Sequence, residues 1–277
     1  MFTESVSPEF AAQIETGEVN AWLDMYAALP SDFARQFGFT ITQVQDVVLT
    51  CCKPIPFVHF NCVKNLGINA PASEALVDEL IATYRAADIQ NFTIYHIPHS
   101  QPPALSEWLT QRGFQPQGSW DRIYRNNAAL AMPLVASNGN FKVEKVTRAT
   151  ATQWAEYIDA IYGLPTSPWL LALVGRPGWH HYLLRNGGEI VAVRTMYIHP
   201  DGLAWLGIDA PVPGIMAPSY DLDLQLCQAI VQDGINLGVR YFVADIEAPS
   251  PQLDTPAYRN FEALGFKRLY SRSHYCN

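Results

Sequence analysis

The chain has 277 residues, of which 49% are hydrophobic, and this length and apolar content suit two domains of ordinary size. The formal net charge of -8 argues against nucleic acid or an anionic membrane as a partner, and no apolar run approaches the ~20 residues that cross a bilayer. The five cysteines are odd in number and lack Cys-x-x-Cys spacing, and Met1 to Glu4 begin no signal peptide, so a reduced, cytoplasmic protein without disulfides or zinc is expected.

The first half begins with a predicted amphipathic helix and a meander of strands. Between Asn20 and Leu29, Trp22 and Tyr26 share one apolar face of a helix that Pro30 ends. Strands are then expected over residues 38–44, 46–52 and 56–60. The pattern next predicts a helix over 73–87, a strand over 92–97, a helix that ends at residue 112 and a strand over 120–125.

The segment after this strand is small, neutral and turn-rich, which predicts a linker over residues 133–140. The second half is then expected to hold a strand over 142–146, a helix from Thr150 or Thr152 to Ile161, and a further helix from Ser167. Three antiparallel strands follow over residues 179–184, 189–198 and 203–209, and two adjacent glycines predict the first hairpin.

The chain ends with a helix–strand–helix–strand unit. Helices are predicted over residues 219–237 and 255–264, and strands over 239–246 and 266–275. Displacing the sequence by 150 residues aligns this unit with residues 73–125, and Gly-Phe follows the second helix in each case. The match predicts two copies of one fold, and the alternative is a chance coincidence of two generic α/β units.

The run FEALGF from Phe261 carries a family resemblance. Its Glu, Leu, Gly and Phe match the Tyr-Glu-Lys-Leu-Gly-Phe-like run of the GNAT superfamily of acyl-CoA-dependent N-acyltransferases, and the first half, with FNCVKNLG and SEWLTQRGF, looks like that of tandem GNAT proteins. The resemblance covers most of the chain from about Phe39. It implies an α+β fold class with two tandem GNAT-like domains, each a mixed, mostly antiparallel sheet flanked by helices. The implied limits are 1–132 for a degenerate N-terminal domain, 133–140 for the linker and 141–277 for a C-terminal GNAT domain.

The resemblance also implies an acyl-CoA co-substrate, whose pyrophosphate would bind backbone N–H groups before the helix that starts near residue 219. The expected cofactor-binding residues are Gly214, Ile215, Met216, Ala217 and Ser219, together with Ile208 and Asp209 at the end of the preceding strand. The family usually has Arg or Gln and two Gly or Ala residues there, whereas PGIMAPSYDLDL has one glycine and no arginine. Asp221 and Asp223 would occupy or repel the anion, unless they only complement the helix dipole.

Acyl transfer to an amine needs a base, because a free alkyl amine with a pKa of ~10 is almost fully protonated at pH 7. Asp209, Asp245 and Glu247 lie at or near predicted strand ends and are candidate bases, although such carboxylates also serve as solvated ends or caps. Phe261 replaces the tyrosine that the family uses as an acid. Tyr258, one helical turn earlier, is the candidate acid, and packing is its alternative role.

An aromatic substrate pocket is expected from Tyr162, Trp169, Trp179 and His180, which could equally be core residues. His180 and His181 are not read as a metal pair, because neighbours on a strand point to opposite faces, so no metal is expected. The resemblance therefore implies an N-acyltransferase that moves an acetyl or similar group from acyl-CoA to a small-molecule amine. The altered motifs favour the alternative, an inactive GNAT relative that binds a small molecule or serves as a scaffold. The oligomeric state stays open.

Overall fold

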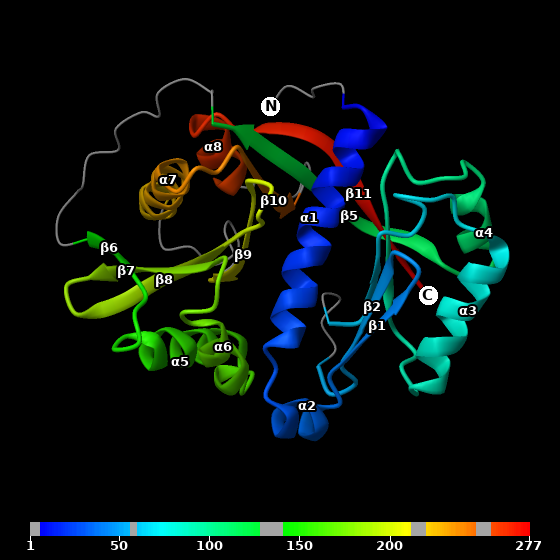
Figure 1. The fold of residues 1–277 in the computed structure, drawn as a ribbon, viewed down its shortest axis with the longest axis horizontal. Coiled ribbons are helices and arrows are strands. Elements are labelled where there is room, and N and C mark those ends of the chain that lie inside the picture. Colours follow the sequence, from blue (N-terminus) through cyan, green and yellow to red (C-terminus); the bar gives the residue numbers. More distant parts are fainter. Residues whose placement is uncertain (1–5, 56–59, 128–140, 212–219, 248–255) are drawn as a thin grey trace. The chain divides into compact units, whose positions relative to one another are not determined.

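The computed structural model describes residues 6–55, 60–127, 141–211, 220–247 and 256–277. The described residues form two compact units (Figure 1). The first unit contains residues 6–120 together with Tyr270–Asn277, and the second unit contains Asp121–Leu269. Each unit is described separately below.

The first unit is built on a sheet with the strand order β1-β2-β3-β4-β11. β1, β2 and β3 form an antiparallel meander, β4 runs parallel to β3, and β11 pairs antiparallel with β4. The elements in chain order are α1 (Pro8–Ala27), α2 (Ser31–Phe37), β1 (Thr40–Val44), β2 (Val47–Cys51), β3 (Cys62–Lys64), α3 (Glu74–Ala86), β4 (Thr93–His96), α4 (Leu105–Gln111), β5 (Gln115–Asn126) and β11 (Lys267–Cys276).

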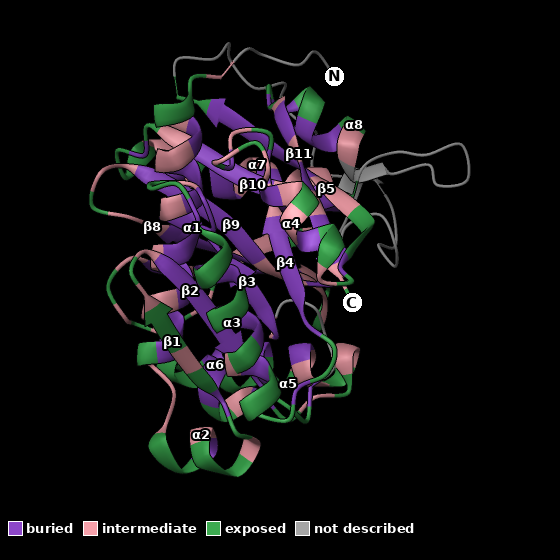
Figure 2. Cartoon of the chain, turned by 90° about the vertical axis from the view of Figure 1, so that its right-hand side faces the viewer, coloured by how far each residue is buried: buried purple, intermediate pink, exposed green. Residues whose placement is uncertain are grey.

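The helix α3 forms where the sequence predicts it. The hydroxyl of Ser73 accepts a hydrogen bond from the N–H of Leu76 at 3.1 Å and so caps the helix. The buried face of α3 then packs on β2, β3 and β4 in one hydrophobic cluster. Figure 2 shows buried residues along β2, β3 and β4 and exposed residues on the outer face of α3, as this packing requires.

Two first-unit predictions differ from the structure. The predicted helix over residues 20–29 is only the last part of α1, which has 20 residues and begins after a Ser7 cap. Its earlier turns bury Glu15 and Glu18, and these acids interrupt the apolar pattern that sequence reading depends on. The third meander strand is β3, and most of the strand predicted over 56–60 falls outside the described residues.

The second unit has the strand order β5-β10-β9-β8-β7-β6. β6, β7, β8 and β9 are successively antiparallel, and β10 is parallel to β9. Figure 1 shows α5 and α6 on one face of this sheet and α7 and α8 on the other. The elements are β6 (Phe141–Lys145), α5 (Ala151–Tyr162), α6 (Ser167–Leu173), β7 (Trp179–Asn186), β8 (Glu189–Ile198), β9 (Leu203–Ala210), α7 (Tyr220–Asn236), β10 (Tyr241–Glu247) and α8 (Pro256–Ala263).

The order of elements agrees with the predicted repeat. The first unit has α3–β4–α4–β5 after β3, and the second has α7–β10–α8–β11 after β9. In both cases the strand before the first helix is parallel to the strand after it. Each of these parallel pairs interrupts an otherwise antiparallel strand order, since consecutive parallel strands need a helical crossover instead of a hairpin.

The compact units divide the chain elsewhere than the predicted domain limits. β5 begins in the first unit and ends in the second, and β11 begins in the second unit and ends in the first. Apolar periodicity identifies both segments as strands but carries no information about which unit each end joins. The predicted linker over 133–140 lies outside the described residues, so the limits 1–132 and 141–277 stay a prediction.

Candidate functional site

The parallel strands β9 and β10 pair over only part of their length. Their ladder has three residue pairs and ends at Val243 and Trp205, whereas β9 continues to Ala210 and β10 to Glu247. The register between β8 and β9 shifts before this end, and Ile208 has a positive φ of 50°. The backbone groups of residues 206–210 and 244–247 therefore do not pair across β9 and β10 in the described structure.

A buried cluster lies beside the end of β9 and is called the Arg194 cluster, comprising Arg194, Asp209, Asp223, Cys227 and Asn260. Nε of Arg194 donates to Oδ1 of Asp209 at 2.7 Å, and Nη2 donates to Oδ1 of Asp223 at 2.9 Å. Nη1 contacts Sγ of Cys227, and Nδ2 of Asn260 donates to Oδ2 of Asp223 at 3.0 Å. All three guanidinium nitrogens have protein partners, so the orientation of Arg194 is fixed.

The guanidinium of Arg194 contacts the carboxyl groups of both Asp209 and Asp223 in this cluster. The side chains of Arg194, Asp223 and Asp209 are 2%, 9% and 25% exposed, so Asp209 is the accessible one of the three. Burial raises the pKa of the Asp209 carboxyl, and the Arg194 cation opposes this shift. Burial would lower the pKa of Arg194, but Asp209 and Asp223 raise it above its ordinary value, so the guanidinium stays charged.

The residues predicted to bind the cofactor are only partly within the described chain. Ile208 and Asp209 lie near the end of β9, whereas Gly214, Ile215, Met216, Ala217 and Ser219 lie outside the described residues, as does the side chain of Asp221. Asp223 points inward to Arg194 and Asn260 and is 7% exposed. Its carboxylate is therefore held by partners within the fold and does not project as a free anion.

The candidate acid Tyr258 is engaged by a carboxylate. Its hydroxyl donates to Oδ2 of Asp121 at 2.7 Å, and Asp121 also lies 3.0 Å from Nε of Arg268. Burial raises the pKa of Tyr258 well above its usual range, and the hydrogen bond to Asp121 raises it further. The phenol is therefore protonated at neutral pH. The structure gives no hydrogen bond between Tyr258 and the Arg194 cluster among the described residues.

The three candidate bases lie in different surroundings. Asp209 belongs to the Arg194 cluster, whereas Asp245 on β10 forms an ion pair with the fully buried Arg122, at 3.2 Å between Nη1 and Oδ2. Glu247 is exposed at the last position of β10. Asp209 and Asp245 both combine partial exposure with an ion-pair partner at the unpaired strand ends, with side chains 25% and 12% exposed. Asp209 is the more exposed of the two and is the candidate base that the geometry favours.

The four residues predicted to form a substrate pocket are not all brought together. The hydroxyl of Tyr162 donates to the backbone carbonyl of Asp209, which places this ring beside the end of β9. Trp169 and Trp179 are buried, at 2% and 5% exposure. His180 lies on the face of β7 opposite to Trp179, since side chains alternate along a strand.

The neighbouring His181, on the same face as Trp179, is a core residue. Its ring lies 4.2 Å from that of Trp154 between centroids and stacks at 6.0 Å on Trp179. Its Nδ1 lies 2.9 Å from the hydroxyl of Thr195. Burial lowers the pKa of His181 to about 4, so the imidazole is neutral at physiological pH.

Sequence reading missed Arg194, which is the centre of the candidate site. The signal was present, because Arg194 is the single charged residue between Ile190 and Ile198 in an otherwise apolar strand. A cation in such a strand is buried only when carboxylates neutralise it, so its partners had to be sought among the acids of nearby elements.

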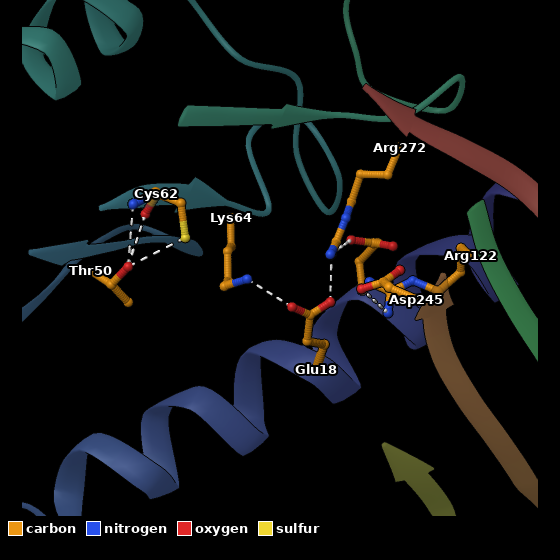
Figure 3. A network of polar contacts seen from close by, with 8 residues as sticks. Glu18, Thr50, Cys62, Lys64, Arg122, Asp245 and Arg272 are labelled. Atoms are coloured by element: carbon orange, nitrogen blue, oxygen red, sulfur yellow. Dashed lines mark hydrogen bonds and ion pairs between the residues drawn. The ribbon is translucent and has the colours of Figure 1, made fainter. Parts of the chain in front are cut away.

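The first unit contains a different buried cluster of charges, called the Glu18 cluster, comprising Glu15, Glu18, Lys64, Tyr270 and Arg272. Figure 3 shows Glu18 on α1 between Lys64 and Arg272. Nζ of Lys64 lies 2.7 Å from Oε1 of Glu18, and Nη1 of Arg272 contacts Oε2 of the same residue. Arg272 also lies 3.5 Å from Glu15, whose other oxygen accepts from the Tyr270 hydroxyl at 2.9 Å. Two cations and two carboxylates balance here, and they connect β11 to α1.

The segment before α3, which corresponds by the repeat to the predicted cofactor loop, is closed by its own chain. The N–H of Gln101 donates to the carbonyl of Gly67 at 2.7 Å, and the carbonyl of Gln101 accepts from the N–H of Ala72 at 2.8 Å. A Cβ at Gly67 would lie 2.3 Å from this carbonyl oxygen. These backbone groups are therefore not offered to a ligand.

Gly67→Ala is expected to destabilise the chain more than Gly38→Ala. Both glycines have positive φ, 73° and 62°, which costs a residue with a Cβ about 1–2 kcal/mol. Only at Gly67 does the new Cβ meet backbone, whereas nothing lies within 4 Å at Gly38, so overpacking adds about 1–3 kcal/mol to the loss at Gly67. Urea unfolding of the two variants measures the difference, and equal losses would contradict the closure by Gln101.

Two further properties concern the described part of the chain. No three or more His, Cys, Asp or Glu side chains group there in a way that could hold a metal ion. No helix in the same residues combines the length and hydrophobicity that a membrane crossing requires. The buried carboxylates of Glu15, Glu18, Asp121 and Asp223 instead pair with Lys64, Arg194, Arg268 and Arg272.

Comparison with known proteins identifies the fold. No protein-family model matches the sequence, and no curated protein matches it. Among solved structures, a GCN5-related N-acetyltransferase from Kribbella flavida is 14% identical, with a TM-score of 0.61 over 96% of this chain and 95% of that chain. A GCN5-related N-acetyltransferase from Sphaerobacter thermophilus is also 14% identical, with a TM-score of 0.58 over 89% of this chain and 84% of that chain.

A tandem GNAT protein from the clavulanic acid biosynthesis pathway is 13% identical, with a TM-score of 0.56 over 96% of this chain and 95% of that chain. At these identities the likeness concerns the fold. It confirms the predicted fold class, two GNAT-like parts with mostly antiparallel sheets flanked by helices. The chain therefore has the fold of the GCN5-related N-acetyltransferases in its tandem form.

Proposed function

We propose that the second unit is an acyl-CoA-dependent N-acyltransferase that moves an acetyl or similar acyl group to a small-molecule amine. The observation that carries this proposal is the partly exposed Asp209 at the unpaired ends of β9 and β10, in a fold shared with N-acetyltransferases. The backbone groups of residues 206–210 and 244–247 would pair with the amides of the pantetheine arm, because an extended amide chain completes an open strand edge.

In the proposed reaction, Asp209 takes a proton from the acceptor ammonium, directly or through water. The neutral amine then attacks the thioester carbon, the C–N bond forms, and the C–S bond breaks with release of a thiolate. The nitrogen loses a second proton to give the amide, and this loss balances the proton that the thiolate takes up. Tyr258 is the proposed proton donor, since it stays protonated at neutral pH. Glu247, exposed at the end of β10, is the alternative base.

The sequence around the start of α7 offers few cations to the phosphates of the coenzyme. Residues 195–239 contain no Lys or Arg, and the cation of Arg194 is already paired with two carboxylates. Binding would therefore rest on the backbone N–H groups of Gly214, Ile215, Met216, Ala217 and Ser219 at the start of α7. The acceptor pocket would be formed by Tyr162, Trp169 and Trp179. His180 would not belong to it, because its side chain lies on the opposite face of β7 from Trp179.

The same charge distribution favours a second candidate function, a GNAT-fold protein that binds a small molecule without transferring an acyl group. Phe261 in place of a phenol supports it, since this ring has no proton to donate. The identity of the amine and a cytoplasmic location stay predictions in either case.

Calorimetry with acetyl-CoA tests the proposal first. The control ligand is ADP, which lacks the pantetheine arm and the thioester. Micromolar binding of acetyl-CoA that ADP does not reproduce supports the enzyme, whereas no heat up to millimolar acetyl-CoA supports the second candidate. A screen of small primary amines follows, with release of the free thiol as the signal. Binding without thiol release from any amine would also favour the second candidate.

Tyr258→Phe is expected to slow acyl transfer at least about tenfold if Tyr258 supplies the proton to the leaving thiolate. The variant loses the hydroxyl and its hydrogen bond to Asp121 but keeps the ring that packs on the core. Steady-state rates measure the effect, and Tyr157→Phe on α5 is the matched control. An unaltered rate would return Tyr258 to a packing role.

A further inference from the structure

We infer that Arg194 is a positioning residue of the proposed reaction, because it holds one carboxylate oxygen of Asp209 and leaves the other for the acceptor amine. This inference rests on the proposed function of the second unit. Arg194 is remote in sequence from the motifs of the family resemblance, and its side chain contacts residues of β9, α7 and α8.

The Asp209 residue is held at two points. Its Oδ1 accepts from Nε of Arg194 at 2.7 Å, and its backbone carbonyl accepts from the hydroxyl of Tyr162. Its Oδ2 has no hydrogen-bond partner in the part of the chain that the structure describes, and a quarter of the side chain is exposed. The carboxylate therefore presents one defined oxygen, as a base must when it accepts a proton from a bound amine.

Arg194 in turn is fixed by the two helices on its side of the sheet. Asp223 and Cys227 hold it from α7, and Asn260 on α8 holds Asp223. The guanidinium carbon lies 5.5 Å from the centroid of the Phe261 ring, within cation–π range. A planar guanidinium reaches these partners at once, whereas a lysine ammonium in its place would keep the charge and lose the multiple contacts.

Several charged and titratable groups face Asp209 and set its charge state. Arg194 reaches it from β8, Asp223 and Cys227 lie on α7 within the same cluster, and Tyr162 contacts it from α5. Arg194 favours the ionised carboxylate, and Asp223 disfavours it. Removing the cation would raise the pKa of Asp209, so the acyl-transfer rate would reach its maximum only at a higher pH.

Arg194→Lys tests the inference in the full chain. We expect kcat to fall about 100-fold, as for a reacting group displaced by about 1 Å, with KM for acetyl-CoA within about threefold of the parent value. In an Asp209→Asn background the same change is expected to have almost no further effect on kcat, because the two residues act as one unit. Arg185→Lys on β7, which pairs with Glu144 outside the cluster, is the control and should keep full activity.

Carboxyl-carbon NMR titration of Asp209 gives a readout that does not depend on turnover. Arg194→Lys is expected to alter the carboxyl-carbon chemical shift of Asp209 or the pH midpoint of its titration, whereas Arg185→Lys is expected to alter neither. If Arg194→Lys folds poorly by circular dichroism, Asp223→Asn replaces it, because this change removes an anchor of Arg194 and keeps the Arg194–Asp209 contact. The expected loss of kcat is then about tenfold.

The outcomes separate the two proposals. A parent chain that transfers no acyl group overturns the proposed function, whatever the variants do. An active parent whose Arg194→Lys variant keeps both kcat and the Asp209 titration overturns the positioning role alone. Equal losses from Arg194→Lys with and without Asp209 would also overturn it, because Arg194 would then act independently of that carboxylate.

Discussion

Arg272→Met is expected to lower the free energy of unfolding of the chain by about 3–5 kcal/mol, the usual loss when one partner of a buried ion pair is removed. Arg272 is 1% exposed and contacts both Glu15 and Glu18, which are themselves buried. Without its guanidinium, two buried carboxylates face the single ammonium of Lys64 in the Glu18 cluster. Methionine keeps much of the side-chain volume, so the loss measures charge more than packing.

Urea unfolding monitored by tryptophan fluorescence measures this effect. The matched control is Lys53→Met, which removes an ion pair with Asp88 whose side chains are 61% and 72% exposed, and it is expected to change stability little. A triple change of Arg272, Glu15 and Glu18 to apolar residues is expected to recover much of the loss. A loss for Arg272→Met no larger than that for Lys53→Met would show that the Glu18 cluster does not support the first unit.

Asp209→Asn is expected to lower kcat for acyl transfer by about 10²–10⁴-fold, the range for removal of a general base. The amide cannot accept a proton from an ammonium, and the Arg194–Asp223 ion pair remains to hold the cluster together. Acetyl-CoA affinity is expected to stay within about threefold of the parent value, because the proposed coenzyme contacts are made by backbone groups.

The pH dependence gives a second signature of the same residue. Burial raises the pKa of Asp209, and a base works only when ionised, so the parent rate is expected to decline as pH falls through that pKa. Asp209→Asn should remove this acidic limb. Glu189→Gln, at the exposed start of β8, is the control and should leave both the rate and the profile unchanged. Persistence of the acidic limb in Asp209→Asn would assign the base to another group, with Glu247 the next to test.

Most elements could be predicted from the sequence because their signals are local. The residues of α3 combine a serine cap with an apolar face at helical spacing, and β8 is bounded by a glycine hairpin and a proline turn. The helix α1 was predicted too short, because Glu15 and Glu18 on its inner face look solvent-facing until Lys64 and Arg272 are known to lie opposite.

The candidate site was less accessible to sequence reading, since its geometry depends on residues far apart in the chain. Asp209 could be proposed from its place at a strand end, but its partner Arg194 lies 15 positions earlier and Asn260 lies on α8. The sequence allows two roles for Asp223, repulsion of an anion or complementation of the helix dipole, whereas the structure holds it between Arg194 and Asn260. Charge pairing across elements is decided by tertiary packing, and no local pattern encodes it.

The passage of β11 from one unit into the other has a consequence for biosynthesis. Residues 270–277 are synthesised about 150 residues after the rest of the first unit, yet they pair with β4 and bring Arg272 to the inner face of α1. The nascent first unit must therefore wait, with Glu15 and Glu18 lacking this counter-ion, while about 150 further residues are translated. At ~5–20 residues per second this delay lasts roughly 7–30 seconds, and the first unit can complete its sheet and its buried ion pairs only after residues 270–277 have been synthesised.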